Sequence, residues 1–592
     1  MGFKKLSEQE LSEHISNADE IIAIINGELK KVSIETLVSL MNKTFDVSVA
    51  ANTDKEYKLK VNIGETTIIT PNLRVASITS IKIVKGHLIF YFSDGTTMDA
   101  GIVDASRIPE YGVMRDINSH SPTLTRIGAA ANLAANAGVG SDVVRNDFDN
   151  IYPWSEMRKC ILAEDGTVTA YEGDATYTED GSLGRVMVEI PKFYLKHYID
   201  EENAKERWYI CREQKDGDYR LPQPFYSADG TELDTIYIAA YLSASDKDNK
   251  GNSKSGNVHC SKMSYSAALQ QAREIGDNWH MVDVAELTDV IQPLFIVEFA
   301  TLDSQSVMYG QPGCTADMFA CISVSENHCF GDGSDPNTTY IGNHFYSFDF
   351  TEGLVVGQEI VIGIDAEYVK DEFDYVDKDG AYAVRKVTGV EVVNTDEYGT
   401  ESLKITFSGT PIEVNENYFA GYSWGRNGAT QEIAASSGSV ANNVGLCAMH
   451  YRGIENLYGF GHTWLNGILA KDGKYFVTDD ILKNGTSAEE YTELSFPIPS
   501  ANGYIRKMGA DAAVPWAYVP SETDGASDED FCDYFQKITS QGNALSCTFG
   551  YSSELQNGLF TFFVYRPVQN AIAQYLRIAY RKYLPDNEGG NS

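Results

Sequence analysis

Long apolar runs are absent from this sequence, and so are the cysteine patterns of a cross-linked secreted protein. No window approaches the roughly 18 consecutive apolar residues that a membrane-spanning helix needs. The nine cysteines include no C-x-x-C pair, so we expect reduced, mostly buried thiols and synthesis in a cytoplasm. The first residues, MGFKKLSEQELSEH, contain neither an apolar stretch nor a small-residue cleavage site. We therefore expect no secretory signal and no membrane insertion.

Positive charge is also scarce. Lys and Arg number 47 against 84 Asp and Glu, which gives a formal net charge of −37. Such a chain repels nucleic acid and anionic membranes, so neither is an expected partner. Proline is rare (17), whereas Gly (50), Tyr (35) and Phe (26) are plentiful, and this favours strands and turns over helical bundles. At 592 residues the chain exceeds what one hydrophobic core holds, so several domains are expected.

The first fifty residues predict a small helix–hairpin–helix unit. Residues 20–25 and 28–32 are runs rich in β-branched side chains, joined by Asn26-Gly27, the strongest short hairpin signal. A short capped helix precedes this hairpin, and an amphipathic helix follows it over residues 34–45. A unit of this size buries little surface alone. We expect it to be an anchor that docks on a partner or on further copies of the chain.

Composition divides the whole chain into five parts, and the expected fold class is multidomain α+β. The parts are residues 1–50, the helix–hairpin–helix anchor; 51–104, a β-meander stalk; 105–150, an extended connector; 151–347 with 423–592, a head; and 348–422, a small β-domain inserted in the head. Within the head, amphipathic patterns predict helices over residues 265–275 and 284–301. The patterns near the C-terminus predict two final strands of a buried sheet.

No motif for catalysis or cofactor binding is complete. Gly138-x-Gly140 lacks the third glycine of a dinucleotide-binding loop, and no phosphate-binding P-loop exists. Two acidic loops, 246–257 and 375–386, lack the carboxylates of a calcium loop, and the cysteines between 314 and 329 are spaced too widely for a zinc knuckle. We expect no catalytic residue, no metal and no cofactor. The 84 carboxylates prevent any glycosidase pair from being singled out, so polysaccharide cleavage stays open.

Aromatic residues in the last third of the chain are candidates for contact with a ligand. Tyr and Trp beside small polar residues offer contact area and stack on sugar rings. Trp516 and Tyr551 lie in polar stretches, so we expect them at the surface, whereas Trp424 and Trp464 are more typical of a core. The candidate ligand-binding residues are Trp516, Tyr518, Tyr551, Gln556 and Asn557.

Residues 448–459, followed by Trp464, resemble the core signature of C-type-lectin-like domains of the formylglycine-generating-enzyme type. In that family a glycine–x–glutamate–asparagine segment precedes a tryptophan on the next strand. The signature residues here are Arg452, Gly453, Glu455, Asn456 and Trp464. The resemblance implies that the head has a C-type-lectin-like fold. The copper-holding cysteine pair of those enzymes and the calcium motifs of the lectins are missing from this sequence, which weakens the case for catalysis and for calcium binding.

Phage receptor-binding proteins are similar to such a domain. The start of the chain resembles the virion-attachment and stalk segments of phage tail or head fibres, which are usually trimeric. The resemblance implies a homotrimeric fibre or spike on the virion surface, attached to other virion proteins through residues 1–50, whose head binds a host cell-surface glycan or protein. Two alternatives stay open, namely a surface-polysaccharide-degrading enzyme and a purely structural capsid decoration protein.

Overall fold

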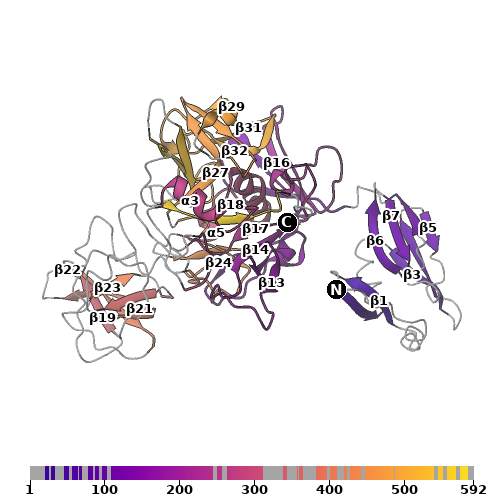
Figure 1. Ribbon diagram of the computed structural model, residues 1–592, viewed down its shortest axis with the longest axis horizontal. Coiled ribbons are helices and arrows are strands. Elements are labelled where there is room, and N and C mark those ends of the chain that lie inside the picture. The colour runs from indigo at the N-terminus through magenta and orange to yellow at the C-terminus, as the bar shows by residue number, and fades with distance from the viewer. Residues whose placement is uncertain are drawn as a thin grey trace, which may run out of the picture. The chain divides into compact units, whose positions relative to one another are not determined.

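A computed structural model of the chain is β-rich and contains several separate sheets (Figure 1), which confirms the expectation of a mostly β, multidomain protein. Two compact units are distinguished, Met1–Pro109 with Lys215–Gly217, and Glu110–Gln214 with Asp218–Ser592. The residues that the structure describes are 20–25, 28–33, 46–52, 57–63, 66–69, 78–84, 87–92, 97–102, 108–243, 250–256, 263–310, 338–342, 356–357, 359–363, 382–395, 400–409, 419–422, 427–441, 447–459, 461–483, 485, 487–538, 544–550, 557–567 and 574–584.

The first unit contains three small antiparallel sheets. Their strands are β1 (Glu20–Ile25) and β2 (Glu28–Ser33); β3 (Asp46–Asn52), β4 (Tyr57–Ile63) and β5 (Thr66–Ile69); and β6 (Ile78–Val84), β7 (His87–Phe92) and β8 (Thr97–Ile102). The predicted hairpin is confirmed, because Ile25 pairs with Glu28 across Asn26-Gly27. The meander predicted within residues 51–104 is confirmed as well. The helices expected on either side of the hairpin fall outside the described residues.

The segment expected to be an extended connector belongs instead to the second unit. It supplies the first two strands of an antiparallel sheet with the order β10 (Thr125–Gly128), β9 (Tyr111–Asp116), β16 (Lys205–Cys211) and β15 (Tyr194–Asp200). Here Val113 pairs with Trp208, and both side chains are buried. The prediction of an extended connector over residues 105–150 was wrong. The strands in this segment are short, and its many small residues obscure the alternation of apolar and polar side chains.

Three further sheets and a hairpin complete the body of this unit. One sheet has the order β13 (Val168–Tyr171), β12 (Arg158–Leu162), β14 (Arg185–Pro191), β17 (Thr235–Ala239), β37 (Ile578–Tyr580) and β18 (Trp279–Met281). A second has the order β29 (Thr492–Pro497), β28 (Lys474–Val477), β27 (His462–Lys471), β34 (Leu545–Phe549), β35 (Phe562–Pro567), β33 (Tyr534–Lys537) and β30 (Gly503–Tyr504), with β36 (Gln574–Tyr575) beside β27. The smaller elements are β11 (Gly138–Val139), β24 (Ser437–Ser439), β25 (Met449–Tyr451) and β26 (Ile454–Glu455), and the hairpin of β31 (Lys507–Asp511) with β32 (Val514–Glu522).

The chain's last strands lie in two different sheets rather than in the single one expected. Strand β35 belongs to the sheet built around β27, whereas β37 pairs on both sides within the other large sheet, between β17 and β18. The C-terminal strand is therefore held between segments that are more than 200 residues earlier in the sequence.

The described helices of the second unit differ in burial, since α3 (Tyr265–Arg273) buries one face and the helix that follows it is buried throughout. Ser264 caps α3 by accepting a hydrogen bond from the Ala267 amide, as the predicted helix over 265–275 requires. The predicted helix over 284–301 is present but divided into a π-helix, Glu286–Ile291, and α4 (Gln292–Phe299). Every residue of both segments is buried, so this helix is a central element rather than an amphipathic surface one. A single turn, α5 (Ser304–Val307), follows.

The strands between residues 338 and 422 form one five-stranded antiparallel sheet. Its order is β19 (Thr338–Gly342), β22 (Thr400–Phe407), β21 (Tyr382–Thr395), β20 (Glu359–Gly363) and β23 (Phe419–Tyr422). Among the described strands these pair only with one another. The described chain before and after this segment lies against the same β25–β26 hairpin, since Gly310 packs on Met449 and the Gly428 amide bonds to Glu455.

Because the chain on both sides of the segment 311–426 contacts the β25–β26 hairpin, we expect this segment to be dispensable for folding of the rest of the second unit. Its replacement by about twelve Gly and Ser residues, which span roughly 20 Å, is expected to leave the melting temperature of the remaining protein within a few degrees of the wild type. Differential scanning calorimetry measures this directly. A protein that no longer gives a cooperative transition after the replacement would contradict the expectation.

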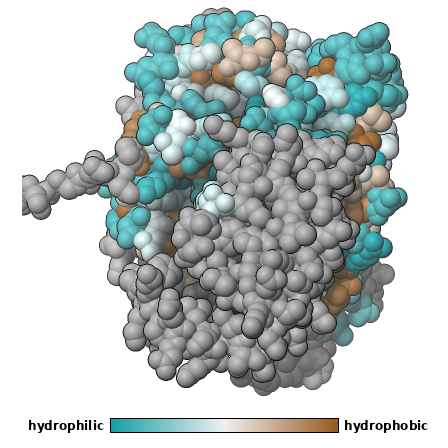
Figure 2. Space-filling model, turned by 90° about the vertical axis from the view of Figure 1, so that its right-hand side faces the viewer, coloured by the Kyte–Doolittle hydropathy of each residue, from teal (hydrophilic) through white to brown (hydrophobic). Residues whose placement is uncertain are grey.

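The described surface is largely hydrophilic on the side shown in Figure 2, with hydrophobic residues in small groups between the polar ones. Within the part of the chain that the structure describes, no helix has both the length and the apolar character needed to cross a membrane.

Candidate functional site

Three of the five candidate ligand-binding residues lie in the protein interior. Trp516 and Tyr518 of β32 are 7% and 4% exposed, and Asn557 is 1% exposed. The expectation that Trp516 lies at the surface is therefore wrong, and none of the three presents its side chain to a ligand. Tyr551 and Gln556 fall outside the described residues.

The burial of β32 has a clear physical cause. The strand packs on the π-helix, where the Thr288 hydroxyl donates to the Trp516 carbonyl at 2.6 Å. The Tyr518 hydroxyl donates to Glu206 at 2.6 Å, and its ring meets His197 edge-on. The polar residues near Trp516 in the sequence, Asp511 before it and Ser521 and Glu522 after it, lie at the ends of β31 and β32, so they gave no information about the buried middle of the strand.

Asn557 lies where the chain is fixed at the end of the segment 551–556. The side chain of Gln305 donates both to the Gly310 carbonyl, at 3.0 Å, and to the Asn557 carbonyl, at 2.8 Å. The buried carboxylate of Asp533 accepts from the amides of Gly558 and Phe560, at 2.8 and 2.7 Å. Gly310 and Asn557, which are 247 residues apart in the chain, are thus held next to each other by one side chain.

The first signature residues form the turn between β25 and β26. Arg452 and Gly453 have φ values of 45° and 86°, as a two-residue type I′ turn requires, and they connect the paired residues Tyr451 and Ile454. A Cβ atom at position 453 would lie 3.0 Å from the Lys159 side chain. Glycine is therefore favoured at this position both by its backbone conformation and by the space around it.

Arg452 is the centre of a buried ionic network. Its guanidinium forms a two-pronged pair with Glu298 of α4, at 2.7 and 2.9 Å, and also donates to the Trp154 carbonyl at 3.1 Å. The Tyr451 hydroxyl and the Asn146 amide donate to the same carboxylate, at 3.0 and 2.7 Å. Both members of the ion pair are almost fully buried. The network fixes the hairpin to the central helix, and Glu298 is a member that the sequence reasoning missed.

Glu455 holds the chain where it returns from the inserted sheet. Its carboxylate accepts from the amides of Gly428 and Thr430, at 3.0 and 2.9 Å, and from the Thr430 hydroxyl at 2.7 Å. The fully buried Arg577 donates to the carbonyls of Glu455 and Asn456, at 2.7 and 3.1 Å. Burial raises the pKa of Glu455 to about 7, because the three hydrogen bonds offset the loss of solvation only in part.

This raised pKa predicts a pH dependence of stability with a defined sign. The folded state binds a proton at Glu455 more tightly than the unfolded chain does, so this group lowers stability progressively as the pH rises from about 4.3 to about 7, by roughly 3–4 kcal/mol in total. Relative to the wild type, Glu455→Gln should therefore gain stability over this pH range. Urea denaturation at several pH values measures the difference, and a difference that is independent of pH would contradict the assignment.

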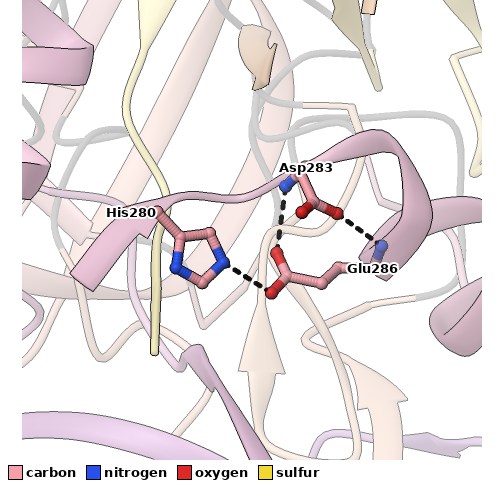
Figure 3. A group of neighbouring side chains, drawn as sticks. All are labelled: His280, Asp283 and Glu286. Carbon is pink, nitrogen blue, oxygen red and sulfur yellow. Dashed lines mark hydrogen bonds and ion pairs between the residues drawn. The ribbon is translucent and has the colours of Figure 1, made fainter. Parts of the chain in front are cut away.

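His280, Asp283 and Glu286 form a compact buried group at the start of the π-helix (Figure 3). Asp283 and Glu286 accept each other's backbone amide hydrogens, at 2.8 and 2.9 Å, which is a capping box. A His280 ring nitrogen lies 2.7 Å from Glu286. The spacing of the two carboxylates was visible in the sequence as D-x-x-E, a signal that could have located this group.

The donor set of this group matches a metal site, but a guanidinium already lies beside it. Arg581 contacts Asp283 at 2.9 Å and Glu286 at 3.6 Å. Both carboxylates are also engaged by backbone amides, and all four side chains are sealed from solvent. Burial raises the pKa of Asp283. For Glu286 burial acts in the same direction, but His280, Arg581 and the Asp283 amide together outweigh it and lower the pKa. We conclude that Arg581 supplies the positive charge and that the group stabilises the fold.

Trp464 is confirmed as a core residue. It lies on β27, is fully buried, and donates from its indole nitrogen to the Met263 carbonyl at 3.0 Å. Four of the five signature residues, Arg452, Glu455, Asn456 and Trp464, therefore lie in the interior, whereas Gly453 is half-buried in the turn between β25 and β26. No protein-family model matches this chain, and no curated protein matches it in sequence.

Proposed function

We propose that this chain is a subunit of a phage fibre or spike. Residues 1–50 would attach it to the particle, and a C-type-lectin-like head would bind a receptor on the host surface, with a glycan as the favoured class. The observation that carries the proposal is the double hydrogen bond from Gln305 to Gly310 and Asn557. A framework that holds two distant points of the chain, here Gly310 and Asn557, side by side is typical of binding proteins, which present loops on a rigid core.

The small size of the sheets in the first unit supports assembly into a homotrimer. Sheets of two or three strands hide little apolar surface and need packing partners for stability, and the described strands of the first unit form three such sheets. Copies of the chain would supply those partners and would also multiply weak receptor contacts. Sedimentation equilibrium should give three times the 65.3 kDa mass of one chain, and a monomer at micromolar concentration would contradict the assembly.

Adhesion of the purified full-length protein to host cells tests the receptor function. Fluorescently labelled protein is expected to bind the host strain at a saturable number of sites, and excess unlabelled protein should displace it. Heat-unfolded protein serves as the control for nonspecific attachment. Equal labelling of host and non-host cells would contradict the proposal, and release of soluble sugar from the cells would indicate a degrading enzyme instead.

A further inference from the structure

The outer face of the sheet containing β15 and β16 carries tyrosines among charged side chains. The inner face packs on α4 through buried residues such as Trp208 and Ile210. Because side chains alternate along a strand, Tyr209 and Arg207 of β16 point to the opposite face, where they pair across the strands with Lys196 and Tyr198 of β15. Tyr198 is 39% exposed.

Tyr209 lies on a glycine of the neighbouring strand. A Cβ atom at Gly112 would stand 2.4 Å from the Tyr209 ring, so only glycine allows the ring to rest on the backbone of β9. The Tyr209 side chain shares a hydrogen bond with that of Tyr198. One surface of the Tyr209 ring is thus supported by the sheet, as in aromatic platforms on which sugar rings stack.

The charged side chains around this platform are paired. Lys196 contacts Asp218 at 2.7 Å, Lys205 contacts Asp116 at 2.7 Å, and Arg207 contacts Asp200 at 3.2 Å. A further carboxylate, Glu110, lies near Tyr209 and accepts a hydrogen bond from Tyr219. This face therefore has no local excess of positive charge, and the whole chain carries −37. Polyanionic ligands are therefore repelled by the long-range field, whereas hydroxyl groups can bond to the paired donors and acceptors.

We propose that this face is a binding platform for a neutral glycan, with the Tyr209 ring as the stacking surface. The Tyr198 hydroxyl, Lys196 and Arg207 would hydrogen-bond the sugar hydroxyls. The inference rests on the proposed receptor function and specifies it, since it names the ligand class and places contact on a sheet face that is separate from the candidate residues of the last third of the chain.

Two substitutions at one position test the platform in the full-length protein. Tyr209→Leu keeps apolar cover over Gly112 but removes the aromatic surface, and Tyr209→Phe keeps that surface. The probes are immobilised neutral oligosaccharides of glucose, galactose and mannose, with oligogalacturonate as the acidic comparison. We expect binding of at least one neutral probe, a loss of affinity of about tenfold or more in Tyr209→Leu, and a change of no more than about twofold in Tyr209→Phe.

The outcomes separate this inference from the receptor function. Three results would contradict the platform. The wild-type protein could bind no neutral oligosaccharide, it could bind oligogalacturonate more tightly, or it could have the same affinity for the neutral probes as Tyr209→Leu. Adhesion to host cells that is equal for wild type and a folded Tyr209→Leu would also overturn it and leave the receptor proposal standing. Binding of a neutral probe without adhesion to cells would support the platform and contradict the receptor function.

Discussion

Replacing Glu298 by glutamine is expected to lower the free energy of unfolding of the second unit by about 3–5 kcal/mol, the range for breaking one side of a buried ion pair. The Arg452 guanidinium is almost fully buried and depends on Glu298 for both prongs of its pair. Glutamine has nearly the same shape but removes the buried partner, so the partly exposed Asp149, at 3.1 Å, is the carboxylate that Arg452 still contacts. Urea denaturation followed by tryptophan fluorescence measures the effect, since all six tryptophans lie in this unit.

Two comparison variants separate the ion pair from other causes. Glu202→Gln makes the same chemical change at an exposed turn and is expected to change stability by no more than about 0.5 kcal/mol. In a Glu298→Gln, Arg452→Met double variant both charges are absent, so part of the lost stability should return. A double variant that is less stable than Glu298→Gln by the full cost of Arg452→Met alone would show that the two side chains act independently.

Arg581→Met is expected to have an effect of similar size, about 3–5 kcal/mol near pH 8. Arg581 is the arginine that lies beside Asp283 and Glu286, and all three side chains are buried. Without it the two carboxylates have lost a stabilising positive charge, so their pKa values in the folded state should rise. A group whose folded pKa is raised loses stability as the pH rises, so the deficit of the variant should be larger at pH 8 than at pH 5.5.

A chelator tests whether this group needs a metal ion. Treatment of the wild type with a chelator should leave its melting temperature unchanged, because Arg581 already supplies the positive charge. For the effect of Arg581→Met on stability, Arg145→Met is the matched control. Arg145 pairs with Asp147 at the surface, where such pairs contribute at most about 1 kcal/mol. A melting temperature that falls with the chelator and recovers with added zinc or calcium would contradict this account.

The sequence predicted correctly those elements that a few neighbouring residues determine. Asn26-Gly27 is typical of a two-residue hairpin turn, and β1 and β2 pair directly on either side of it. Ser264 specified the start of α3 by capping it. The Arg452-Gly453 turn and the buried Trp464 lie within the segment whose pattern suggested the signature of the head.

Features that depend on distant partners were not predictable in the same way. The surface placement of Trp516 failed because the π-helix that covers β32 comes 230 residues earlier in the chain. The strand β9 was missed because its hydrophobic alternation spans only six residues and acquires its partner, β16, from outside the supposed connector. Glu298 and Arg581 could not be singled out among 84 carboxylates and 47 cations, since only folding brings them to their partners.

Protection of host cells by the purified protein is the most direct test of the central claim. Cells of the proposed host strain are incubated with full-length protein, washed, and challenged with the phage to which we propose that this chain belongs, and the surviving infectivity is counted as plaques. If the chain is the receptor-binding subunit, plaque numbers should fall with protein concentration and recover when heat-unfolded protein is used. Undiminished infection at protein concentrations that saturate the cell surface would contradict the account.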